Sequence, residues 1–165
     1  MDRFFVLNQR LPRAVAAVLV GAMLALSGAV FQSLSRNPLG SPDIVGFTTG
    51  ASTGGLFMLL LAASASDLQV SAGAVLGGFV TAAAVALLSR RGGVDGDNLV
   101  LTGVAISEML SAANNYLISQ ASLPGAESVK AWQYGSFNAI SWGQVKPLAL
   151  AAAVLLIQVV WLVRP

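Results

Sequence analysis

The sequence predicts an all-α membrane protein, folded as a bundle of several membrane-spanning helices. Of its 165 residues, 56% are hydrophobic and only 10% are charged, whereas a soluble domain carries about 25% charged residues. The mean hydropathy is +0.76, and the few charged side chains cluster so that long neutral stretches lie between them. Only helices and closed barrels can span lipid, and these stretches lack the alternating pattern of barrel strands.

The neutral stretches predict five transmembrane helices, because about 20 helical residues cross the ~30 Å hydrocarbon core. The predicted spans are 14–35, 44–65, 68–89, 98–120 and 147–164. Between them, Ser41-Pro42-Asp43 is typical of a capped helix start. Arg90 and Arg91, followed by two glycines, are typical of a helix end.

The composition excludes several functional classes. The chain has no Cys and no His, which excludes disulfides, thiolate or imidazole metal sites and Cys or His catalysis. No phosphate-binding G-x-x-x-x-G-K-[ST] loop occurs, and the net charge of +2 is small and scattered. We therefore predict no catalytic residues, no metal, no cofactor in this chain and no nucleic-acid partner.

Glycines recur at every fourth position in two of the predicted helices, at Gly46, Gly50 and Gly54 and at Gly73 and Gly77. Small residues at this spacing let helix backbones approach closely in lipid. The repeats could form a seam between two subunits or pack helices within one subunit. We favour packing within one subunit.

Glu108 carries the only charge inside the predicted span 98–120. Ten residues from the helix start place it about 15 Å deep, near the bilayer midplane. Ser111, Asn115 and Ser119 follow on the same helical face. A polar stripe of this kind is typical of a water-filled pathway, and intramembrane carboxylates usually mark function. The alternative is that Glu108 packs, protonated or hydrogen-bonded, against a neighbouring helix.

Three short segments have a more specific pattern. Residues 10–13 read RLPR, residues 36–43 read RNPLGSPD, and residues 132–137 read WQYGSF. Together they resemble the FecCD family, the permease subunits of ABC importers for iron-siderophores, haem and cobalamin. The resemblance extends through essentially the whole chain, and it is closest to permeases for ferric-enterobactin-type siderophores.

The resemblance implies that residues 1–165 are part of a transmembrane permease domain, about helices two to six of about ten. It implies a multi-pass protein of the inner (cytoplasmic) membrane that is not itself an enzyme. The expected partners are an ATP-binding cassette subunit that binds ATP and Mg²⁺, a periplasmic or lipoprotein substrate-binding protein, the lipid bilayer and a second permease subunit. The permease pair could be a homodimer or a heterodimer.

The resemblance also assigns roles to individual residues. Arg10 and Arg13 would lie on the outer face and receive carboxylates of the binding protein, a task suited to the planar, always charged guanidinium. Their alternative role is to anchor the helix start among lipid headgroups. Asn37, Pro38 and Leu39 match the segment that narrows the cytoplasmic mouth, although a rigid turn needed only for folding would have the same composition.

Two further consequences concern the fourth predicted span and its outer end. The helix that carries Glu108, Ser111 and Asn115 would line the translocation pathway at the dimer axis, and a short outer-face helix would lie within residues 121–146. A competing function is a proton-coupled secondary transporter with Glu108 as the coupling carboxylate. The RLPR and RNPLGSPD segments argue against that function.

Overall fold

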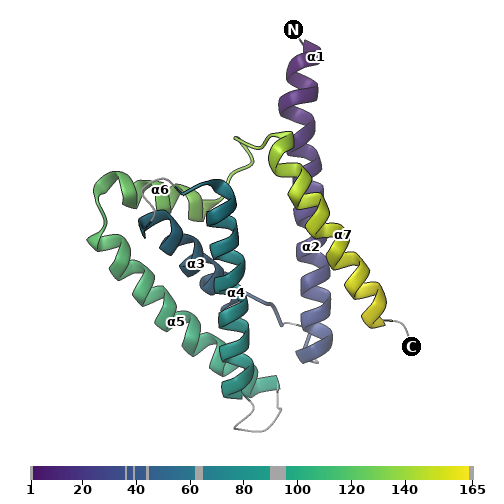
Figure 1. Ribbon diagram of the computed structural model, residues 1–165. Helices are drawn as coiled ribbons and strands as arrows, with labels where there is room; N and C mark the ends of the chain where they lie inside the picture. Colours follow the sequence, from purple (N-terminus) through teal and green to yellow (C-terminus); the bar gives the residue numbers. More distant parts are fainter. Residues whose placement is uncertain are drawn as a thin grey trace. The chain divides into compact units, whose positions relative to one another are not determined.

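The computed structural model describes residues 2–35, 37–38, 40–43, 45–61, 65–89 and 96–163, and these residues contain helices and no strand (Figure 1). They form two compact units. The terminal unit comprises Met1–Ala29 and Ser136–Pro165, and the central unit comprises Val30–Gly135.

The terminal unit is built on one continuous helical segment, which consists of α1 (Asp2–Phe5), the π-helical η1 (Val6–Arg10) and α2 (Leu11–Ser35). The last turns of α2 belong to the central unit. The terminal unit also contains α7 (Trp142–Val163). Side chains of both helices are buried in this unit, namely Pro12, Ala16, Val145 and Ala152.

The helical segment begins well before the predicted residue 14, and η1 explains how it passes Pro12. The amide of Leu11 bonds to the carbonyl of Val6, one residue further back than in an α-helix. In this wider turn the carbonyl of Leu7 would need a donor at Pro12, which has no N–H. The indole Nε1 of Trp142 donates to that carbonyl instead, at 2.9 Å.

Two helix starts are fixed by a serine with a glutamine three residues later. The amide of Ser141 donates to Oε1 of Gln144 at 2.8 Å, and the amide of Ser66 donates to Oε1 of Gln69 at 2.9 Å. At Ser66 the cap is reciprocal, because the amide of Gln69 donates back to the serine hydroxyl. Helix α7 therefore starts at Trp142, and Pro147 lies inside it. The predicted span 147–164 placed this proline at the start of the helix.

The central unit contains α3 (Phe47–Leu61), α4 (Asp67–Ser89), α5 (Gly96–Gln120) and α6 (Leu123–Tyr134). Helix α3 packs mainly on α4 and also contacts α5 and α6 (Figure 1). Phe31, Val45 and Val85 form a buried cluster in this unit.

The glycine repeats hold α3 against α4 within this chain, as we favoured from the sequence. A Cβ at Gly50 would lie 2.9 Å from the carbonyl oxygen of Gly77, and one at Gly73 would lie 2.8 Å from that of Gly54. These distances leave no space for a side chain, so the two backbones are in direct contact.

Three helical segments of the described chain are long and apolar enough to cross a membrane, against five predicted: Arg3–Ser33, Asp67–Ser89 and Trp142–Trp161. Helix α3 has 15 residues and spans about 22 Å, which is shorter than the hydrocarbon core. Helix α5 has 25 residues, but Glu108, Asn114 and Asn115 make it too polar to qualify by composition. The two predicted spans that do not meet these criteria, 44–65 and 98–120, lie in the central unit.

Candidate functional site

A cavity of about 250 Å³ lies between α3, α5 and α6 in the central unit. Every side chain that lines it is polar and uncharged. The lining consists of Thr48, Thr49 and Ser52 of α3, Ser111, Asn114 and Asn115 of α5, and Gln133 of α6.

Two glycines bring the start of α3 onto α5. Gly46 has a φ of +83°, which an L side chain rarely adopts, and a Cβ there would lie 3.1 Å from Cβ of Ser107. A Cβ at Gly103 would lie 2.5 Å from Cα of Val45. Larger residues at either position would therefore force the two elements apart.

Hydroxyl groups join α3 to α5 at this close approach. The hydroxyls of Thr49 and Ser107 are hydrogen-bonded at 2.7 Å. The hydroxyl of Thr53 donates to the carbonyl of Thr49 at 2.9 Å, and that of Thr48 donates to the carboxylate of Asp43. Four hydroxyls beside the cavity are thus engaged within the protein.

Asn114 is the most buried side chain of the cavity wall. It is only 4% exposed, and its Oδ1 has no hydrogen-bond partner among the described residues. Spacings of four and three residues place Ser107, Ser111 and Asn114 on one face of α5, and this is the face that meets α3.

Helix α6 is held on α3 by an aromatic ring. A Cβ at Gly55 would lie 2.8 Å from Cζ3 of Trp132, so the ring occupies the space that the glycine leaves open. Val129 of the same helix is fully buried. These contacts place Gln133, the residue after Trp132, at the cavity.

The structure brings together two of the three predicted pathway residues. Ser111 and Asn115 line the cavity, whereas Glu108 is exposed on α5 and is not among its lining residues. At 3.6 residues per turn, Glu108 lies about 100° around the helix from Ser107. It therefore lies on a surface of α5 that the described residues of the central unit leave uncovered.

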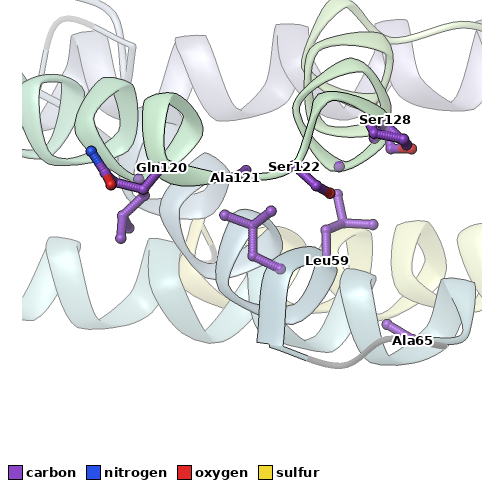
Figure 2. A pocket seen from close by; sticks show the side chains of 10 residues that line it. Leu59, Ala65, Gln120, Ala121, Ser122 and Ser128 are labelled. Carbon is purple, nitrogen blue, oxygen red and sulfur yellow. The ribbon is translucent and has the colours of Figure 1, made fainter.

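A second cavity, of about 660 Å³, lies where α5 ends and α6 begins (Figure 2). Leu59 lies on its α3 side, while the side chains of Gln120, Ser122 and Ser128 line it from the α5–α6 side. This cavity contains no predicted site residue and no charged lining residue.

The two arginines of the RLPR segment have different surroundings in the terminal unit. Arg10 is exposed at the end of η1. Arg13 is half-buried, and its guanidinium donates to the carbonyl of Asn138. The Nε of Arg13 is buried without a partner among the described residues. Arg13 thus ties the segment before α7 to α2, and Arg10 is the arginine open to another protein.

Replacement of Arg13 by methionine is expected to lower the thermal stability of the permease. Methionine keeps an apolar stem but loses the hydrogen bond to Asn138, a loss of about 1–2 kcal/mol, or about 2–8 °C in Tm at about 2–4 °C per kcal/mol. The measurement is the unfolding midpoint of the purified protein in detergent. Arg10→Met is the matched control and should leave the midpoint unchanged, and equal midpoints for both variants would contradict this role of Arg13.

The predicted gate segment is described in part. Asn37 and Pro38 are exposed in the connection between α2 and α3, and the amide of Gly40 donates to the carbonyl of Asn37 at 3.0 Å in a tight turn. Leu39 lies outside the described residues, as do Arg36 and the predicted helix end at Arg90 and Arg91. The gate therefore stays a prediction.

The comparison with known proteins decides the family. The FecCD transport family matches residues 1–165, the full length of the sequence. The chain belongs to the FecCD transport family.

Individual relatives agree with this assignment. The chain is 44% identical over 156 residues to the ferric enterobactin transport system permease protein FepG of Escherichia coli (strain K12), covering 94% of this chain and 47% of that protein. It is 41% identical over 140 residues to the achromobactin transport system permease protein CbrC of Dickeya dadantii (strain 3937), covering 84% and 40%. It is 33% identical over 161 residues to a vitamin B12 import system permease protein BtuC of Yersinia pseudotuberculosis, covering 97% and 47%.

The fold is also that of a solved transporter. The chain matches an inward-facing conformation of a metal-chelate type ABC transporter with a TM-score of 0.80 and 33% identity, covering 93% of this chain and 50% of that one. The FecCD chain thus spans about half the length of the curated relatives it matches. With its three apolar spans it is a multi-pass protein of the inner membrane.

Sequence reasoning missed most of the cavity wall of this FecCD chain. Thr48, Thr49, Ser52 and Asn114 were not singled out, and Gln133 was noted only as part of the WQYGSF segment, although all five line the cavity. A signal was present, because the hydroxyl residues of α3 interrupt an otherwise apolar stretch at helical spacing. The polar face of α5 was assigned from Glu108, which shifted it away from Ser107 and Asn114.

The described residues offer no metal centre, since no three His, Cys, Asp or Glu side chains gather in them. The cavity supplies hydroxyls and carboxamides, which form hydrogen bonds but carry no charge. This arrangement is suited to holding or passing neutral polar groups. It contains no pair of groups arranged for acid–base or nucleophilic chemistry.

Proposed function

We propose that this chain is part of the permease subunit of a binding-protein-dependent ABC importer and forms part of the pathway for an iron-siderophore complex. ATP, with Mg²⁺, would be hydrolysed by a separate ATP-binding cassette subunit. The match to the FecCD transport family over all 165 residues carries the proposal.

The nature of the cargo is supported by the relatives and by the chemistry of the chain. The relatives named for ferric enterobactin and achromobactin are 44% and 41% identical, against 33% for the vitamin B12 permease. The chain has no His or Cys, and its central cavity is lined by neutral polar groups. Iron that arrives already chelated needs no ligands from the pathway.

We propose the following roles for the site residues. Arg10 receives a carboxylate of the periplasmic or lipoprotein substrate-binding protein, for which its exposed position is suitable. Asn37, Pro38 and Leu39 form the cytoplasmic gate. Glu108 faces the pathway shared with a second permease subunit, a role that fits its exposure among the described residues of the central unit.

The experiment is iron uptake by cells that lack their own permease and carry the full-length gene. Radioactive iron-siderophore uptake should require both the binding protein and an active ATPase, and it should stop with an ATPase-dead partner. Glu108→Gln should still support uptake, since glutamine keeps a polar group on the pathway. Uptake that survives the dead ATPase but is lost in Glu108→Gln would instead favour a proton-coupled transporter.

A further inference from the structure

The carboxamide oxygen of Asn114 is buried without a hydrogen-bond partner among the described residues. The side chain is 4% exposed, and its Oδ1 has no hydrogen bond among the described residues. A buried polar group without a partner is strongly unfavourable, and native proteins pair such groups with protein atoms or with ordered water.

Neighbouring side chains are already engaged and do not supply that partner. The hydroxyl of Thr49 bonds to Ser107, and the hydroxyl of Thr48 bonds to Asp43. The cavity next to Asn114 has a volume of about 250 Å³. That volume has room for several water molecules, each of which needs two to four polar partners.

The charge of the wall limits what can bind in the cavity. No lining residue is acidic or basic, so a cation or an anion would lose its hydration without gaining a counter-charge. Hydroxyls and carboxamides both donate and accept hydrogen bonds. The ligand that fits is small, neutral and able to donate and accept at once.

We propose that this cavity is a hydration site, in which bound water completes the hydrogen bonds of Asn114, Ser52 and Ser111. Helix α6 forms one wall of the site, because Trp132 is seated on Gly55 and places Gln133 at the cavity. The bound water provides partners that can be exchanged when α5 shifts against α3. All the residues that line the site belong to this chain.

The direct test uses cysteine accessibility in the full-length permease complex in membrane vesicles, since this 165-residue chain has no native cysteine. Ser52→Cys and Ser111→Cys place a thiol on opposite walls of the cavity. Thr81→Cys is the matched control, because Thr81 is 5% exposed where α4 packs on α3. Reaction with 2-aminoethyl methanethiosulfonate requires a thiolate, which forms only where water reaches the sulfur.

We expect both cavity cysteines to react at least about tenfold faster than the Thr81→Cys thiol, because their thiolate fraction is higher in water. Cavity cysteines as slow as the control would overturn hydration.

A second measurement concerns Asn114 itself. Asn114→Leu replaces the carboxamide by an apolar side chain of similar size. If water pairs the carboxamide, the variant loses those bonds and its Tm falls; if the carboxamide is unpaired, the variant removes an unfavourable group and its Tm rises. We expect a fall, and an unchanged or higher Tm would overturn the proposal. Neither measurement depends on transport, so failure of the proposed import function would leave both results interpretable.

Discussion

Replacement of Gly54 by leucine is expected to abolish the accumulation of folded permease. A Cβ at this position would lie 2.8 Å from the carbonyl carbon of Gly73 and 3.1 Å from Cα of Gly77. Both are backbone atoms, so the clash cannot be relieved by rotating a side chain. Overpacking costs about 1–3 kcal/mol where side chains can move, and separating two backbones in contact should cost more. The measurement is the amount of permease in the membrane and its elution as a single species in detergent.

The control for this variant is Gly78→Ala, a substitution on the face of α4 that packs on α3. A Cβ at Gly78 would lie 3.6 Å from Cβ of Ala51 and from the carbonyl oxygen of Phe47, which are ordinary contact distances. Alanine is also the better helix former by about 1 kcal/mol, so this variant should accumulate normally. If Gly54→Leu accumulates as well as Gly78→Ala, α3 and α4 do not pack as described.

Charge reversal at Arg10 is expected to lower uptake at least tenfold at unchanged permease levels. The exposed guanidinium would pair with a carboxylate of the binding protein, and loss of such a contact at an interface costs about 2–5 kcal/mol. Each 1.4 kcal/mol corresponds to a factor of about ten in binding. The effect of Arg10→Glu should therefore be a raised KM for the loaded binding protein, measured by uptake at increasing concentrations of that protein.

Arg10→Lys separates charge from geometry at the same position. Lysine keeps the charge but not the planar fork of donors, so an intermediate KM is expected. Because Arg10 is exposed, neither variant should change the amount of folded protein. Uptake by Arg10→Glu with the KM of the unsubstituted permease would show that Arg10 does not receive the binding protein.

The parts of the fold that local sequence determines were predictable. Helix α4 begins at Asp67 against the predicted 68, and α5 ends at Gln120 as predicted, because caps and neutral stretches mark those ends. The start of the first helix was not predictable from nearby residues. The helix passes Pro12 through the π-helical turn η1, and the proline cannot donate to the carbonyl of Leu7. The indole of Trp142, 135 residues further along the chain, donates to that carbonyl instead.

The site shows the same division between local pattern and tertiary packing. Helical spacing on α5 was sufficient to find Ser111 and Asn115, which line the cavity. Helical spacing also marks the hydroxyls of α3 as one face, but it does not assign that face to the cavity, because the role of the face depends on whether it meets α5. That face is set by the close approach at Gly46 and Gly103, and a glycine in one sequence does not reveal its partner.

The most direct test of the import function is transport by the purified complex in proteoliposomes. The full-length permease, its ATPase and the loaded binding protein are combined, and accumulation of the iron-siderophore is followed with ATP and Mg²⁺ or with an imposed proton gradient. The account predicts accumulation that requires ATP hydrolysis and the binding protein and is unaffected by the proton gradient. Accumulation driven by the proton gradient without ATP would contradict it.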